Sequence, residues 1–190
     1  MIPWARLFGC ASVFVMTPVL AWATTVFHLD TPALVEGSSD IVIGHVDALR
    51  SYMSPDHRHI LTEVTVTVAD RLKGDDATQQ VTLVQLGGEV DGMRYTVPGS
   101  PLFKPGEEAL LFIWRDESGR AQVNGLAQGK FDITRDSATG ERLIQRTLPG
   151  LAVKNPRTLA LAARGQPAAR IPLSTMMREI RRALEESGAR

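Results

Sequence analysis

The segment from Ile60 to Leu72 alternates between apolar and polar side chains, and this alternation constrains the fold more than any other feature of the chain. Successive side chains of a β-strand point to opposite faces, so a period of two is typical of a half-buried antiparallel strand. One face is apolar and comprises Ile60, Val64, Val66 and Val68, whereas the other comprises Leu61, Glu63, Thr65, Thr67 and Ala69.

Several other short segments, separated by turns rich in glycine, proline and aspartate, indicate further strands. They cover 41–49, 81–86, 93–97, 109–114, 121–127, 130–134 and 142–148. Strands at this spacing predict an all-β barrel or sandwich, and the most apolar of them, 109–114, is expected to be central. The predicted core comprises Ile43, Val46, Val64, Val66, Val68, Leu83, Leu110, Phe112 and Trp114.

Helices are expected near both ends of the chain. The first covers 31–36, with Thr31 as the N-cap and Pro32 as the first helical residue. The second is an amphipathic helix within 173–190, and 151–172 before it is interpreted as a linker or irregular arm. The apolar stripe of the second helix has helical spacing and comprises Leu173, Met176, Met177, Ile180 and Leu184.

Charge divides the chain at the same place. Residues 24–153 hold 12 Lys+Arg and 18 Asp+Glu, whereas residues 154–190 hold 8 and 3. The basic C-terminal helix therefore either packs on the acidic barrel of its own chain or contacts a membrane or an acidic partner. The first alternative is favoured, because the apolar stripe needs a surface to cover it.

The first 23 residues have the pattern of a signal peptide. Arg6 provides the positive charge, 7–20 is uncharged and mostly apolar, and 21–23 reads Ala-Trp-Ala, a small-x-small cleavage site. The mature chain is expected to begin at Thr24, to lack a transmembrane segment, and to be periplasmic or secreted. Because the only cysteine is Cys10, the mature chain is expected to have no disulfide, thiol nucleophile or zinc–thiolate site.

The region from about residue 40 to about residue 132 resembles an OB-fold module of the netrin/tissue-inhibitor-of-metalloproteinase type. The resemblance rests on 40–46, 71–74 and 103–112, and 87–90 and 125–131 are similar to segments of uncharacterised secreted bacterial proteins. It implies an OB-type barrel. Together with the strand and helix patterns, it predicts a mainly β fold: a small antiparallel OB-like β-barrel over 24–150, with a short N-terminal helix and a C-terminal amphipathic helix. Inhibitors of that type bind the protease metal through a disulfide-held N-terminal cysteine, which this chain lacks.

Motifs for several enzyme classes are missing from the sequence. It contains no Gly-x-Ser-x-Gly, no Gly-x-Gly-x-x-Gly, no phosphate-binding loop and no His-Glu-x-x-His. The net negative charge of 24–153 opposes binding of a nucleic-acid backbone. The composition, 44% hydrophobic and 22% charged, is that of an ordinary globular protein and not of a disordered chain.

Two loops are the best candidates for a binding surface. One is 52–59, and the other is 87–105, which is long, rich in Gly and Pro, and partly apolar. The candidate binding residues are Tyr52, His57, His59, Tyr95 and Phe103. His57 and His59 would face the same side of an extended chain, as two metal ligands require, but the same pattern fits a solvated hairpin end.

These observations predict an exported, non-enzymatic binding or interaction module without a cofactor. Its partner is expected to be another exported protein or a component of the cell envelope, and not a nucleic acid. Two alternatives remain open: a protease inhibitor that does not use a cysteine, and a weak metal-binding domain that uses His57 and His59.

Overall fold

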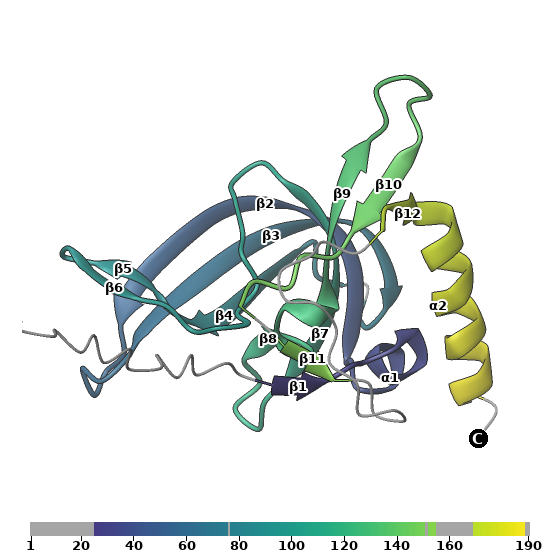
Figure 1. Cartoon of the computed structure of the whole chain (residues 1–190). Helices are drawn as coiled ribbons and strands as arrows, with labels where there is room; N and C mark the ends of the chain where they lie inside the picture. Colours follow the sequence, from purple (N-terminus) through teal and green to yellow (C-terminus); the bar gives the residue numbers. More distant parts are fainter. Residues whose placement is uncertain (1–24, 76, 151, 155–168, 189–190) are drawn as a thin grey trace, which may run out of the picture.

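The computed structural model describes residues 25–75, 77–150, 152–154 and 169–188 (Figure 1). The predicted signal peptide over 1–23 lies outside the described residues, as does most of the predicted arm over 151–172. The described part of the chain is mainly β, with a short helix near its N-terminal end and a longer helix at its C-terminal end. This confirms the predicted fold class.

Five strands form a small mixed β-barrel. They are β2 (Asp40–Met53), β3 (Ile60–Lys73), β4 (Gln80–Leu86), β7 (Glu108–Arg115) and β8 (Ala121–Val123). Around the barrel the order is β2-β3-β4-β8-β7, and β7 pairs again with β2. The barrel strands pair antiparallel, as predicted, except that the short β8 closes the barrel by pairing parallel to β4.

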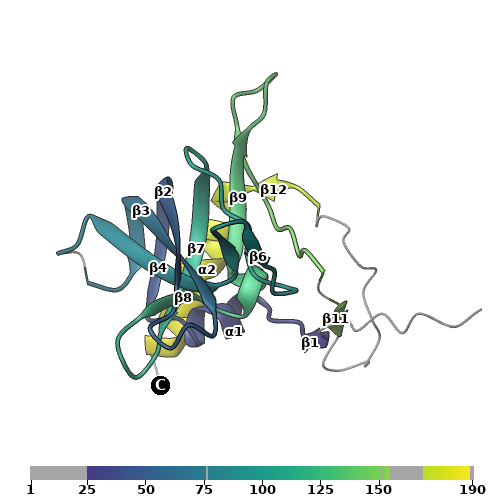
Figure 2. The same cartoon turned by 90° about the vertical axis from the view of Figure 1, so that its left-hand side faces the viewer.

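The remaining strands extend from the barrel. β9 (Lys130–Arg135), β10 (Arg142–Gln145) and β12 (Ile171–Pro172) continue the sheet beyond β7, and the β9–β10 hairpin projects from the barrel in both views (Figures 1 and 2). β5 (Gly88–Val90) and β6 (Met93–Tyr95) form a separate hairpin. β1 (Thr25–Phe27) pairs parallel with β11 (Ala152–Lys154). The arm predicted over 151–172 therefore contains a short strand at each end, β11 and β12. The 3-10 helix η1 covers Leu126–Gly129.

Both faces of β7 are buried, and they belong to two different cores. The side chains of Ala109, Leu111 and Ile113 point into the barrel. Leu110 and Phe112 alternate with them and lie in an outer core between the sheet and the two helices. A continuous apolar run is what a strand covered on both sides requires, so the predicted central position of 109–114 is confirmed.

The two helices cover the outer face of the sheet. α1 (Thr31–Glu36) is capped by Asp30, whose Oδ1 accepts a hydrogen bond from the backbone N–H of Ala33 at 3.0 Å, and not by Thr31 as the sequence predicted. α2 (Leu173–Gly188) packs on its own chain, as the favoured alternative required (Figure 1). Its buried side chains are Leu173, Met176, Ile180 and Ala183.

The predicted core is correct for most residues and wrong for one. Val46, Val64, Val66 and Leu83 fill the barrel, with Val68 partly buried beside them. Ile43, Leu110 and Phe112 are buried in the outer core instead. Trp114 is 37% exposed. It lies on the same face as Phe112 but nearer the end of β7, and it belongs to neither core.

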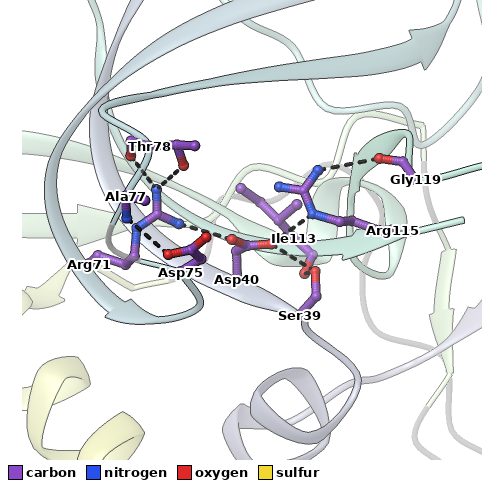
Figure 3. Close-up of polar contacts among 9 residues, drawn as sticks. All are labelled: Ser39, Asp40, Arg71, Asp75, Ala77, Thr78, Ile113, Arg115 and Gly119. Atoms are coloured by element: carbon purple, nitrogen blue, oxygen red, sulfur yellow. Dashed lines mark hydrogen bonds and ion pairs between the residues drawn. The ribbon is translucent and has the colours of Figure 1, made fainter.

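A buried ion-pair network joins three strands at one end of the barrel (Figure 3). Asp40 on β2 accepts hydrogen bonds from Arg71 of β3 at 2.9 Å and from Arg115 of β7 at 3.2 Å. Arg71 also donates to the backbone oxygen of Thr78 at 2.7 Å, and Ser39 donates to Asp40 at 2.8 Å. The Asp40 and Arg71 side chains are almost fully buried, so each charge depends on the other.

Candidate functional site

The β2–β3 ribbon continues beyond the point where β2 leaves β7, and the β5–β6 hairpin lies against this extension (Figure 1). Thr62 Oγ1 donates a hydrogen bond to the Gly87 carbonyl at 2.6 Å, and the Ser51 and Thr62 hydroxyls are 2.8 Å apart. A Cβ at Gly88 would lie 2.4 Å from both hydroxyl oxygens. The hairpin is therefore held against the ribbon at a place where only glycine fits.

Gly88→Ala is expected to destabilise the protein by about 1–3 kcal/mol, because the methyl group collides with Ser51 and Thr62 and the φ of +138° strains any other residue. Gly92→Ala is the matched control in the same hairpin, since its φ is also positive but nothing lies within 4 Å of the added Cβ. Urea unfolding of both variants measures the difference. Equal losses would show that the close approach at Gly88 is unimportant.

A groove of about 540 Å³ lies beside this hairpin. Its walls are formed by parts of β2 and β3, by the end of β4, by β5 and β6, by the loop that follows β6, and by residues 149–150. The apolar lining comprises Leu49, Leu86, Val97, Pro98, Pro101, Leu102, Phe103 and Pro149. The polar lining comprises Ser51, Thr62, Gln85, Glu89, Arg94, Tyr95, Thr96 and Ser100.

Exposed apolar side chains gather around this groove. Six large hydrophobic side chains of the described residues are exposed, and three of them, Leu86, Tyr95 and Leu102, line the groove. A fourth, Met93, belongs to the same hairpin. A concentration of exposed apolar surface rimmed by polar groups is typical of an interaction site.

The groove carries almost no net charge. Glu89 and Arg94 are its only strongly ionisable residues, and they pair with each other at 2.7 Å across the β5–β6 hairpin. The amide oxygen of Gln85 is buried and has no hydrogen-bond partner among the described residues. A buried acceptor without a partner is unfavourable for stability. The groove therefore offers a ligand apolar surface and uncharged or mutually neutralised polar groups.

The structure brings three of the five candidate binding residues together. Tyr95 and Phe103 line the groove, and the His59 ring lies 6.4 Å from the Tyr95 ring, measured between centroids. Phe103 is buried and lies 5.0 Å from the ammonium group of Lys130, which forms an ion pair with Glu107. The two predicted loops thus meet at His59 and Tyr95.

Tyr52 and His57 do not line the groove. The Tyr52 ring lies under the guanidinium group of Arg50 on the ribbon. His57 has a φ of +55° in a tight turn, where its N–H donates to the Ser54 carbonyl at 2.8 Å. In the same turn, a hydrogen bond from the Ser54 hydroxyl lowers the pKa of Asp56.

The chain is consequently not extended from His57 to His59, which was the premise for a metal site there. Among the described residues, no group of three or more His, Cys, Asp or Glu side chains is placed to hold a metal ion. In the same part of the chain, no helix has the length and apolar character needed to cross a membrane.

Several groove residues were not predicted as single positions. Leu86 and Leu102 carry a weak signal, since they are apolar residues beside Gly- and Pro-rich loops. Gln85 and Pro149 carry none, because only the fold brings 149 next to 98–102.

The comparisons with known proteins identify no relative: no protein-family model, no curated protein and no solved structure matches the chain. The resemblance to netrin-type modules therefore stays a prediction, and the structure supports only the small five-stranded mixed barrel.

Proposed function

We propose that this protein is an exported, non-enzymatic binding module that holds an extended, neutral and largely apolar segment of another exported protein in the groove beside β5–β6. The observation that carries the proposal is the gathering of Leu86, Tyr95 and Leu102 around one concave surface. Single exposed apolar residues are common on soluble proteins, but a group around a groove is not.

The polar groups of the groove favour a polypeptide over a hydrocarbon ligand. An extended peptide presents N–H donors and C=O acceptors along its backbone, which polar side chains of the groove such as Thr96 and Ser100 can match. The Ser100 hydroxyl and the paired hydroxyls of Ser51 and Thr62 add further polar contacts. Because Glu89 and Arg94 neutralise each other, the groove offers no charge to attract an ionic ligand.

The same lining supports a role in binding without catalysis. Among the described residues, the lining contains no histidine and no cysteine, and its one carboxylate is already paired with Arg94. General acid–base or nucleophilic catalysis needs an ionisable or activated group within hydrogen-bond reach of the substrate. The concave shape also favours a surface that accepts a segment over an inhibitor that inserts its own loop into a protease cleft.

The proposed location and fold assignment rest on separate support. Export rests on the signal-like pattern of 1–23. We assign the barrel to the OB class, which consists of five-stranded Greek-key barrels. The strand order β2-β3-β4-β8-β7, with one parallel pair at the closure, supports that assignment.

Leu102→Asp is expected to weaken binding of groove-directed peptides by about tenfold or more, because a carboxylate in the groove must be desolvated when an apolar segment covers it. The measurement is selection of a random peptide library on the immobilised protein, followed by titration of the enriched peptides. Leu102 is 63% exposed, so this substitution is expected to leave stability nearly unchanged.

Trp114→Asp is the matched control, since Trp114 is also an exposed large hydrophobic residue but does not line the groove. The proposal requires enriched peptides that are neutral and rich in apolar residues, that bind this control normally and that lose affinity for Leu102→Asp. Peptides that bind both variants equally, or no enrichment at all, would disprove it.

A further inference from the structure

A second cavity, separate from the groove, lies between the two helices and the sheet. It has a volume of about 350 Å³, and its apolar wall is formed by Leu34, Phe131, Ile144, Ile171 and Met176. Arg146, which follows β10, also lines this cavity. The other polar lining residues are His28, Asp30 and Thr31. A partly buried cationic group needs an explanation, since burying a charge is unfavourable unless the charge is paired.

Arg146 differs from the other partly buried arginines of the described residues. Three arginines of the described residues are partly buried, and the two others form ion pairs with carboxylates: Arg71 with Asp40, and Arg142 with Glu108. No carboxylate among the described residues pairs with Arg146. Within the described part of the chain, its Nη1 donates two long hydrogen bonds, to the carbonyls of Leu29 at 3.4 Å and of Gln128 at 3.5 Å.

The remaining contacts of Arg146 do not neutralise its charge. Its guanidinium group lies 5.4 Å from the centre of the Phe131 ring, and its buried Nε has no hydrogen-bond partner in the ranges that the structure describes. Asp30 lines the same cavity, but its Oδ1 caps α1 through the Ala33 N–H. Burial lowers the pKa of Arg146, which agrees with a charged form that lacks compensation.

We propose that this cavity binds a small amphiphilic carboxylate, with its carboxylate paired to Arg146 and its hydrocarbon part against Leu34, Phe131 and Met176. A guanidinium group forms strong, charge-assisted hydrogen bonds with a carboxylate. The volume lies in the range of small-molecule pockets, in which mostly apolar walls surround a few polar groups.

The test is calorimetric titration of the purified protein with octanoate, octanol and octylammonium. These probes share one hydrocarbon chain and differ in charge. Octanoate is expected to bind about tenfold or more tightly than octanol, and octylammonium is expected not to bind. Arg146→Gln is expected to remove the preference for octanoate, whereas Arg50→Gln, at an exposed arginine of the ribbon, is expected to keep it.

His28 provides a measurement that does not depend on a variant. Burial lowers the pKa of His28, the positive charge of Arg146 lowers it further, and Asp30 acts in the opposite direction. A carboxylate bound to Arg146 would cancel part of that positive charge, so NMR titration is expected to show a higher His28 pKa with octanoate than with octanol. This readout stands even if Arg146→Gln does not fold.

Equal affinity for octanoate and octanol, or an unchanged His28 pKa at saturation with octanoate, would overturn the proposal. Amide shifts that map to Tyr95 and Leu102 instead of Leu29 and Ile144 would also overturn it, because they would place the ligand in the groove. The groove proposal is independent of this result, since no residue lines both cavities.

Discussion

Phe112→Ala is expected to lower the free energy of unfolding by about 3–5 kcal/mol, the range for removing a fully buried aromatic side chain. Phe112 has no exposed surface and packs between the sheet and α2, 5.9 Å from the Phe131 ring. The substitution leaves a cavity that the rigid strands on either side of β7 cannot close. Equilibrium unfolding in urea, followed by circular dichroism, measures the loss.

Trp114→Ala is the control on the same strand. Trp114 points to the same face as Phe112, but it is 37% exposed and belongs to neither core. The substitution removes a side chain even larger than that of Phe112. Its loss is expected to be clearly smaller than that of Phe112→Ala. If Trp114→Ala were equally damaging, the outer core would extend beyond the region that the helices cover.

Phe112 and Trp114 also show which part of the fold cannot be predicted from the sequence. The alternation over 60–72 correctly predicts the inner face of β3, because one side of that strand is polar and identifies the other. Strand β7 is apolar on both sides, so its sequence indicates burial without indicating two separate cores. Nothing within 109–114 says that the helices cover Phe112 and leave Trp114 partly exposed.

The sequence signals for the N-terminal helix are correct except for its capping residue, which lies one position earlier than predicted. The pattern around Thr31 and Pro32 predicts α1, but the cap is Asp30, whose carboxylate is an equally good acceptor for the first free N–H groups. The strands β11 and β12 were not predicted, because each contains only two or three residues and depends on a partner far away in the sequence.

The candidate site shows the same division. Tyr95 and Phe103 were predicted because they are aromatic residues in a long Gly- and Pro-rich loop, a kind of segment that often carries function, and both line the groove. His57 was proposed on the assumption of an extended chain, which the turn at φ +55° removes. Arg146 had no distinguishing signal, since its lack of a carboxylate partner is a property of the folded chain alone.

Asp40→Ala is expected to destabilise the protein by about 3–5 kcal/mol, because it leaves the buried charge of Arg71 without its partner. Only 6% of the Arg71 side chain is exposed, and its remaining acceptors belong to Thr78. Urea unfolding at neutral pH measures the change. Glu63→Ala is the control, since it breaks the equally short but exposed pair with Arg50, which water already screens, and its effect is expected to be far smaller.

The double variant Asp40→Ala/Arg71→Met separates two explanations of that loss. If the unpaired charge is the cause, removing Arg71 as well eliminates it, and the double variant is expected to be more stable than Asp40→Ala alone. If the ion pair instead contributes a large attraction of its own, the double variant stays at least as unstable as the single one. The first outcome is expected because the buried charge of Arg71 pairs with no carboxylate other than Asp40 among the described residues, whereas Arg115, the second partner of Asp40, is partly exposed to water (Figure 3).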